Sequence, residues 1–193
     1  MVNGDHLLAD GIGEAGDGLA ENMGNLDFKG KTVLDLGCNF GYYSFLARSA
    51  GARRVLGIDA DARIIRGCEI ITALNRVEGV AFLAIDIVKT EGIGRFDIGL
   101  MIDLIGSQMI GTGTAKAVLD SLESLSEKEM VLTLRPRYHI PKKLAGDFQG
   151  LKEKYPADYI RDNYFHAFDY VCDRFKANWE ATVISAQNDP EVE

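Results

Sequence analysis

The chain has 193 residues, 47% of them hydrophobic, so it is the size of one α/β domain with a sizeable core. Its 29 acidic and 21 basic side chains give a net charge of −8, which argues against extensive nucleic-acid binding because phosphate contacts need clustered Lys and Arg. The three cysteines form no C-x-x-C pair and predict no metal site. No apolar run approaches the ~20 residues of a membrane span. We therefore expect a soluble, cytoplasmic protein without a membrane partner, of open oligomeric state.

The predicted elements alternate between strand and helix. Residues 1–29 are glycine-rich and acidic and are expected to form an N-terminal segment that is mobile or acts as a lid, with a short helix over 19–23. From residue 30 the pattern predicts a single α/β domain over 30–193, with a doubly wound, mostly parallel sheet and helices on both faces. Strands are expected over 31–36, 53–59, 80–85, 96–102 and 130–134, and helices over 41–50, from 62 onward, and over 114–125.

The C-terminal part is less regular. One or two helices are expected over 143–176, followed by a strand over 181–186. Residues 155–179 are rich in Tyr, Phe and Trp. This aromatic segment predicts either a cover over an acceptor pocket or a buried helix face, and the buried face is the more common arrangement of such residues.

The turn after the first strand is the most informative stretch of the sequence. It follows an apolar run and contains Asp35, Gly37 and Gly41, directly before a helix. Glycine lets the backbone turn sharply and approach a ligand, and the carboxyl end of a strand in an α/β sheet is where ligands bind. Asp59 ends the next strand, where an acid bonds ribose hydroxyls in dinucleotide-binding folds. Because Asp35 repels phosphate, we expect a cationic ligand and expect Asp35 to face the crevice.

These residues resemble the first motif of the class I S-adenosylmethionine-dependent methyltransferases, an acid-x-Gly-x-Gly-x-Gly turn, over roughly residues 30–135. The resemblance implies a Rossmann-like methyltransferase fold, with S-adenosyl-L-methionine as the cofactor. It implies that the turn lines the methionine portion, that Asp59 holds the ribose, and that Asp86 and Ile87 flank the adenine. Asn39 departs from the family pattern, which has glycine there. The cofactor-binding residues so implied are Asp35, Gly37, Cys38, Asn39, Phe40, Gly41, Asp59, Ala60, Asp86, Ile87 and Asp103.

Each of these acids also has a purely structural interpretation. Asp35 and Asp59 could cap helices, and for Asp61 we expect the N-cap role. Asp86 could simply begin a loop. Cys38 is expected to be a packing residue, because no His is near it in sequence and small buried cysteines are common.

Direct displacement from a sulfonium depends mostly on alignment, so a general base is optional. Asp103, at the end of the fourth strand, and His139, past the fifth, are the candidate catalytic residues; for His139 an exposed loop position is the competing interpretation. Arg135 and Arg137 are the candidate substrate-binding residues. With Lys142 and Lys143 they form a basic cluster in an acidic chain, which would attract an anionic acceptor or form a solvated loop.

The sequence therefore predicts an S-adenosylmethionine-dependent methyltransferase that acts on a small-molecule or tethered acceptor of open identity. Three alternatives remain. The string Gly-Cys-Asn-Phe-Gly-Tyr-Tyr also resembles the branch that includes wobble-uridine tRNA methyltransferases, which leaves a tRNA-modifying enzyme open. A catalytically silent subunit that binds S-adenosylmethionine would look the same. An NAD-dependent oxidoreductase would share the sheet and Asp59, but Asp35 and the glycine spacing disfavour it.

Overall fold

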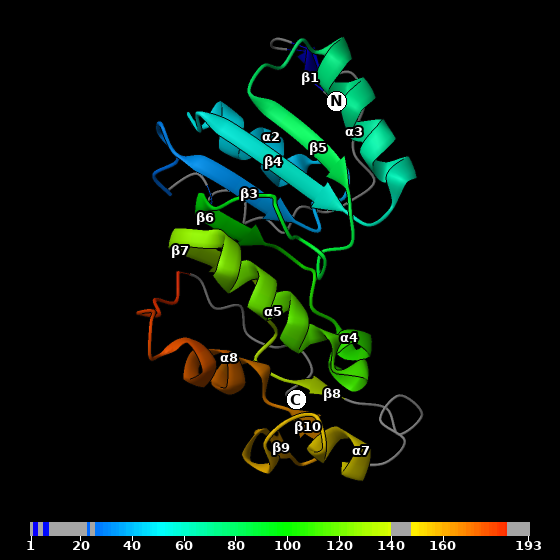
Figure 1. Ribbon diagram of the computed structural model, residues 1–193, viewed down its shortest axis with the longest axis vertical. Coiled ribbons are helices and arrows are strands. Elements are labelled where there is room, and N and C mark those ends of the chain that lie inside the picture. The colour runs from blue at the N-terminus through cyan, green and yellow to red at the C-terminus, as the bar shows by residue number, and fades with distance from the viewer. Residues whose placement is uncertain (1, 4–5, 8–22, 24–25, 140–147, 185–193) are drawn as a thin grey trace.

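The computed structural model describes residues 2–3, 6–7, 23, 26–139 and 148–184. Its central sheet has five strands in the order β5-β4-β3-β6-β7, and every neighbouring pair is parallel (Figure 1). This arrangement confirms the predicted doubly wound, Rossmann-like sheet. The strands are β3 (Thr32–Leu36), β4 (Arg54–Asp59), β5 (Val80–Ala84), β6 (Phe96–Met101) and β7 (Ser126–Leu132).

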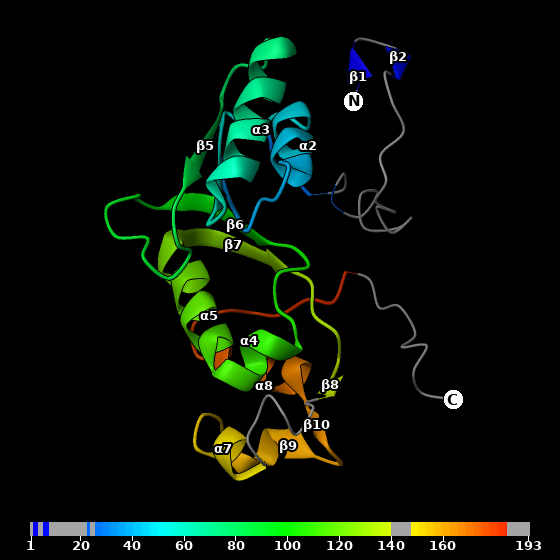
Figure 2. The ribbon, with the colours of Figure 1, turned by 90° about the vertical axis from the view of Figure 1, so that its right-hand side faces the viewer.

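Helices cover both faces of the sheet. The helices α2 (Tyr42–Ser49) and α3 (Ala62–Leu74) lie on one face, and α5 (Thr114–Leu125) lies on the other (Figure 2). Side chains alternate along a strand, so β3 contributes to both layers. Val33 packs in the cluster that contains Ala47 of α2, whereas Leu34 packs in the cluster that contains Leu119 of α5.

The helix α5 begins and ends where the sequence predicts. Its apolar residues recur at helical spacing, and all five that were expected to be buried are buried: Ala115, Val118, Leu119, Leu122 and Leu125. The preceding helix α4 (Ser107–Thr112) was not predicted. It is only six residues long, contains a glycine and has no side-chain N-cap, so its sequence carries little helical signal.

The strand β7 begins earlier than predicted, at Ser126 instead of residue 130. Its first residues are mostly exposed and polar, so apolar patterning reveals only the second half. Parallel pairing with β6 extends the strand, with an irregular register between Phe96 and Ile98.

The C-terminal part forms a small layer below α5 (Figures 1 and 2). It contains α7 (Phe148–Lys152), the short 3-10 helix η1 (Ala157–Tyr159), α8 (Ala167–Phe175) and an antiparallel sheet in the order β8-β10-β9. The strands of this sheet are β8 (Tyr138–His139), β9 (Ile160–Arg161) and β10 (Tyr164–Phe165). A helix through this region is thus wrong for residues 160–165, where β9 and β10 form a hairpin and Asp162 and Asn163 adopt positive φ in its turn. The strand expected over 181–186 is also wrong for residues 181–184, and residues 185–186 lie outside the described part.

The aromatic segment forms a buried cluster. The rings of Tyr155 and Phe165 lie 4.6 Å apart, and both contact Tyr170 of α8 at 5.4 Å. All three side chains are buried and join the same core cluster as α5. All three are buried, but only Tyr170 lies on a helix, so the expected buried helix face is met at Tyr170 alone; Tyr155 lies in a loop and Phe165 on β10.

Near the N-terminus the structure describes a hairpin of β1 (Val2–Asn3) and β2 (His6–Leu7), and the single helical residue Met23. The rest of the helix expected over 19–23 lies outside the described residues. Met23 and Phe28 are fully buried against β3, so the end of the N-terminal segment completes one core layer. Within the described part of the chain, no helix combines the length and apolarity that a membrane span requires.

Candidate functional site

The carboxyl ends of the parallel strands are tied together by hydrogen bonds across the sheet. The N–H groups of Gly37 and Cys38, after β3, donate to the carbonyl of Ile58 in β4 at 2.9 and 3.0 Å. The carbonyl of Asp59 accepts from Ile85, just past β5, at 2.9 Å. These bonds bring the segments that follow β3, β4 and β5 to one rim, as the sequence predicts.

The turn of residues 37–41 requires glycine at both ends. Gly37 and Gly41 adopt left-handed conformations with φ of 74° and 78°. A Cβ atom on Gly37 would lie 2.6 Å from Leu104, and one on Gly41 would lie 2.7 Å from the ring of Phe82. Asn39 also adopts positive φ, 46°, which asparagine tolerates better than most residues. The departure from the family pattern at Asn39 therefore leaves the turn intact.

Asp59 links the turn to the next helix. One carboxylate oxygen accepts from the N–H of Asn39 at 3.2 Å, and the other accepts from the N–H of Asp61 at 2.9 Å. A carboxylate has about four acceptor positions, so two bonds leave capacity for ribose hydroxyls. Asp61 is the N-cap of α3, as predicted, because its side chain accepts from the N–H of Arg63 at 2.9 Å. Hydrogen bonds from the Arg63 side chain and backbone lower the pKa of Asp61 to about 2.

Asp35 lies behind the turn and is 2% exposed. It is inside β3 and not past its end, so its side chain points to the sheet face under α2, where Ser44 donates a 2.6 Å hydrogen bond to it. Burial raises the pKa of Asp35 to about 6, opposed in part by the Ser44 hydrogen bonds. The expectation that Asp35 faces an open crevice is therefore not met, and its contact with a ligand stays a prediction.

The remaining residues assigned to the cofactor differ in exposure. Phe40 is 58% exposed, and its ring lies against Gly67 of α3; Ala60 is exposed. Asp86 accepts from the N–H of Val88 at 3.2 Å within a turn that follows β5, so it does begin a loop. The Ile87 side chain is buried in the core cluster, which leaves only its backbone for an adenine contact.

Thr133 is a rim residue that the sequence did not single out. Its hydroxyl accepts from the N–H of Asp103 at 2.7 Å and donates to the carboxylate of Asp103 at 3.0 Å. Asp103 is exposed and adopts positive φ, 51°. The Thr133 hydroxyl thus holds both the backbone of Asp103, which has an unfavourable φ, and its exposed carboxylate in place after the end of β6. The available signal was a threonine near the carboxyl end of the strand predicted over 130–134.

Tyr43, on α2, is a second rim residue that the sequence did not single out. Burial raises the pKa of Tyr43, and the negative charge of Asp103 raises it further. Tyr43 thus adds a phenol to the first turn of α2, directly after the glycine turn.

His139 does not join Asp103. It lies on β8 of the small sheet, exposed, with its ring 5.5 Å from that of Tyr164. Arg137 lies over the same Tyr164 ring at 4.6 Å. Across the described residues, no hydrogen bond or ion pair connects His139 with Asp103. Arg135 is exposed, and its N–H donates to the hydroxyl of Tyr138 at 3.2 Å. Lys142 and Lys143 lie outside the described residues, so only the two arginines of the predicted basic cluster can be placed.

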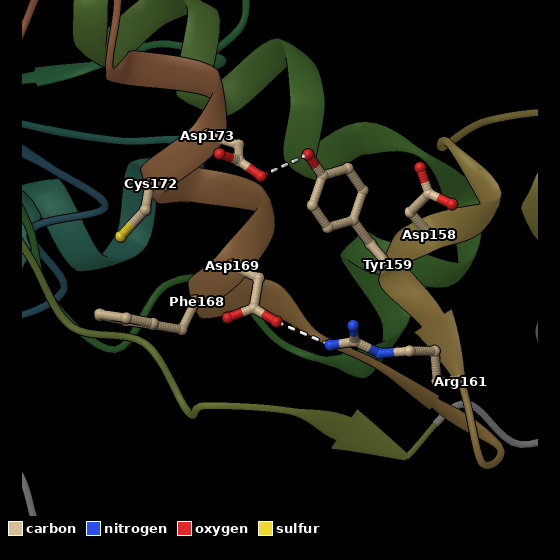
Figure 3. A pocket seen from close by; sticks show the side chains of 7 residues that line it. All are labelled: Asp158, Tyr159, Arg161, Phe168, Asp169, Cys172 and Asp173. Atoms are coloured by element: carbon tan, nitrogen blue, oxygen red, sulfur yellow. Dashed lines mark hydrogen bonds and ion pairs between the residues drawn. The ribbon is translucent and has the colours of Figure 1, made fainter.

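Two hollows open away from this rim. The first, of about 350 Å³, lies between η1, β9 and α8 (Figure 3). Two of its three acids are engaged by neighbours: Asp169 pairs with Arg161 at 2.7 Å, and Asp173 accepts from Tyr159 at 2.9 Å. The second, of about 650 Å³, lies between α3 and the edge strand β5. No residue that the sequence assigned to the cofactor lines either hollow. Phe82, which lines the second hollow, also lies beside Gly41 of the cofactor turn.

A family model described as a methyltransferase domain matches residues 27–177. The chain belongs to this methyltransferase domain family, which confirms the resemblance to class I methyltransferases that the turn and the sheet indicate.

Individual relatives match shorter parts. The chain is 33% identical over 101 residues to the tRNA U34 carboxymethyltransferase of Desulfotalea psychrophila, a match that covers 50% of this chain and 31% of the relative. It is 41% identical over 58 residues to the ribosomal protein L11 methyltransferase of Vibrio cholerae, covering 30% of this chain and 20% of that protein. The chain thus spans less than a third of the length of either relative.

Among solved structures, magnesium protoporphyrin IX methyltransferase from Synechocystis PCC 6803 with bound SAM resembles the chain with a TM-score of 0.50 and 22% identity. The match covers 65% of this chain and 58% of that protein. This likeness bears on the fold.

Proposed function

We propose that the chain binds S-adenosylmethionine at the rim and transfers its methyl group to a small-molecule or tethered acceptor. The observation that carries the proposal is the glycine turn of residues 37–41, joined by Asn39 to the carboxylate of Asp59 at the end of the neighbouring strand. In a chain of the methyltransferase domain family, this pair fits the methionine portion and the ribose of the cofactor.

The residues present fit the cofactor chemically. The left-handed glycines leave backbone without Cβ atoms at the turn, which permits a close approach by the methionine portion. Asp59 keeps acceptor capacity for the ribose hydroxyls. Asp35, behind the turn, is expected to contribute negative charge that favours the amino group and sulfonium over a phosphate. This charge argues against a nicotinamide dinucleotide.

Asp103 is the best-placed candidate for the acceptor side. When bound, S-adenosylmethionine supplies a methyl group on a sulfonium, ready for direct displacement. Thr133 and the positive φ of Asp103 fix one carboxylate at the rim, where it can orient an acceptor or take up its proton. His139 lies in the small sheet and stays a weaker candidate base.

An acceptor with a carboxylate or phosphate group agrees best with the exposed side chain of Arg135 and with Arg137. Guanidinium groups bind such anions through paired hydrogen bonds. The net charge of −8 favours a small acceptor over a polynucleotide. The match to a tRNA U34 carboxymethyltransferase keeps tRNA as the second candidate acceptor.

Ligand-induced stabilisation tests cofactor binding. Binding to the native state alone adds roughly 2.7 kcal/mol at a hundredfold excess over Kd, so S-adenosylhomocysteine should raise Tm by several degrees. NAD should not. The absence of a shift at millimolar S-adenosylhomocysteine would exclude the assignment.

Transfer is tested separately with S-adenosylmethionine labelled on the methyl group. We expect label on small acidic acceptors and none on bulk tRNA. Label on tRNA would overturn the small-molecule acceptor and identify tRNA as the acceptor. Tight cofactor binding without transfer to any acceptor would identify a catalytically silent subunit.

A further inference from the structure

Two buried cysteines meet at the cofactor turn. Cys38 belongs to the turn and is 5% exposed, and Cys68 belongs to α3 and is fully buried. The two residues come from different elements, yet both sulfur atoms lie within hydrogen-bonding distance of one carbonyl oxygen, that of Asn39, at 3.5 Å for Cys38 and 3.1 Å for Cys68. The turn and the helix are therefore joined through a thiol pair.

The two thiols also interact with each other. Their proximity lowers the pKa of Cys68 and raises that of Cys38, so Cys68 is the one that more readily becomes a thiolate. The described residues provide no third His, Cys, Asp or Glu that would complete a metal site with the pair. Two adjacent thiols of unequal acidity, without a metal, are suited to oxidation.

We propose that Cys38 and Cys68 are a modification site, at which a peroxide converts the thiol pair into a disulfide that clamps the turn to α3 and weakens cofactor binding. The second half of this inference rests on the proposed function; the first does not. Cys172 lies apart, on α8, and is the only other cysteine of the chain.

The chemistry balances with a peroxide as oxidant. The Cys68 thiolate attacks hydrogen peroxide, which breaks the O–O bond, leaves a sulfenic acid on Cys68 and releases hydroxide. The sulfur of Cys38 then attacks the Cys68 sulfur and forms the S–S bond, while its proton and the hydroxyl leave as water. Both sulfurs are oxidised and both peroxide oxygens end as water or hydroxide. Cys38 is 5% exposed and adjoins the exposed Asn39, so a small peroxide is expected to approach the pair from the side of Cys38.

Oxidation would act on the cofactor site through Asn39. A disulfide has no S–H group, so the Asn39 carbonyl loses both of its thiol donors. The S–S bond, at about 2.05 Å, is also shorter than any thiol hydrogen bond, so it pulls Cys38 toward α3. Because the N–H of Asn39 donates to Asp59, this movement shifts the turn relative to the carboxylate assigned to the ribose.

The first test is a thiol map of the full chain after treatment with hydrogen peroxide, followed by alkylation of the remaining thiols and mass spectrometry. We expect a peptide that links Cys38 to Cys68, with Cys172 alkylated. The matched control Cys172→Ser should form the same link, and Cys68→Ser should form none. Cys68→Ala serves if the serine variant fails to fold. Retention of both buried thiols while Cys172 is oxidised would overturn the modification site.

The second test is calorimetry with S-adenosylhomocysteine on reduced, oxidised and re-reduced protein. We expect oxidation to lower the affinity about tenfold, comparable to the loss of one charge-assisted hydrogen bond, and dithiothreitol to restore it. Cys68→Ser should bind equally before and after peroxide. Unchanged affinity of the disulfide form would overturn the coupling to the cofactor. Failure of the reduced protein to bind would instead overturn the proposed function, while the thiol map would still decide the disulfide.

Discussion

The hydroxyl of Ser44 donates a 2.6 Å hydrogen bond to the carboxylate of Asp35, and both side chains are buried between β3 and α2. This bond stabilises an ionised acid in a place where burial opposes ionisation. Ser44→Ala should therefore lower the unfolding free energy at pH 7 by about 1.5–3 kcal/mol, the range for hydrogen bonds to charged groups. The difference should shrink at pH 4, where Asp35 is protonated. Equal losses at both pH values in urea titrations would contradict this account.

The pH dependence of stability should carry the signature of Asp35. Its pKa is raised from 3.8 to about 6, so its contribution to stability is present below pH 3.8 and is lost as the pH rises through 6. Asp35→Asn removes that loss and should raise the unfolding free energy at pH 7 by up to about 3 kcal/mol. The pKa of Asp61 is lowered to about 2, so its contribution to stability has the opposite pH dependence: it is present above pH 3.8 and is lost as the pH falls through 2. Asp61→Asn should therefore be less stable than the unmodified protein at neutral pH but not at pH 2. An unchanged slope between pH 4 and 6 in Asp35→Asn would exclude this assignment.

Substitutions of Asp59 and Asp61 should affect cofactor affinity differently. Asp59→Ala removes the carboxylate assigned to the ribose, and a charge-assisted bond is worth about 1.5 to 3 kcal/mol, so affinity for S-adenosylhomocysteine should fall ten- to a hundredfold. Asp61→Ala removes only the N-cap of α3 and should lower the melting temperature without this loss of affinity. Calorimetry and thermal melts check both. If both variants bind normally, the ribose assignment is wrong.

The two kinds of left-handed glycine should respond differently to a methyl group. Gly41→Ala places a Cβ atom 2.7 Å from Phe82, whereas Gly92→Ala, with a similar φ of 81°, meets no atom within 4 Å. The left-handed conformation alone costs about 1–2 kcal/mol, so Gly92→Ala should lose that much and Gly41→Ala more. Only Gly41→Ala should also weaken S-adenosylhomocysteine binding. Equal behaviour in urea unfolding and calorimetry would mean that the contact with Phe82 does not matter.

Thr133 should matter through its hydroxyl. Thr133→Val removes both bonds to Asp103, which already has an unfavourable backbone conformation, so we expect a stability loss of about 1–3 kcal/mol. Thr133→Ser keeps the hydroxyl and should lose much less. With an acceptor in hand, Thr133→Val should also reduce methyl transfer while S-adenosylhomocysteine affinity stays normal. A serine variant as impaired as the valine variant would indicate a packing role.

The basic residues after β7 should act on the acceptor alone. Arg135→Ala and Arg137→Ala are expected to raise KM for an anionic acceptor, less so at high salt because salt screens the attraction. Arg63→Ala, on α3, is the matched control and should leave acceptor KM unchanged. If KM for the acceptor at low salt is unchanged in both variants, Arg135 and Arg137 do not bind the acceptor.

The sequence alone was sufficient for the elements whose signal is local. The apolar runs of β3 and β4, the glycine turn between β3 and α2, the Asp61 cap and the buried stripe of α5 each follow from short-range sterics and periodicity. The common edge of Asp59 and Asp103 followed as well, because parallel strands with right-handed crossovers bring their carboxyl ends together.

Tertiary structure decided what depends on partners distant in sequence. The polar start of β7 is a strand because β6 pairs with it, and the two-residue strands β8, β9 and β10 exist only through their pairing in one small sheet. Three contacts of the site join residues that are 9 to 30 positions apart in the chain. They are the hydrogen bonds of Ser44 with Asp35, of Thr133 with Asp103, and of Cys68 with the carbonyl of Asn39 next to Cys38. Such contacts leave no periodicity in the sequence, because each depends on how two separately formed elements pack.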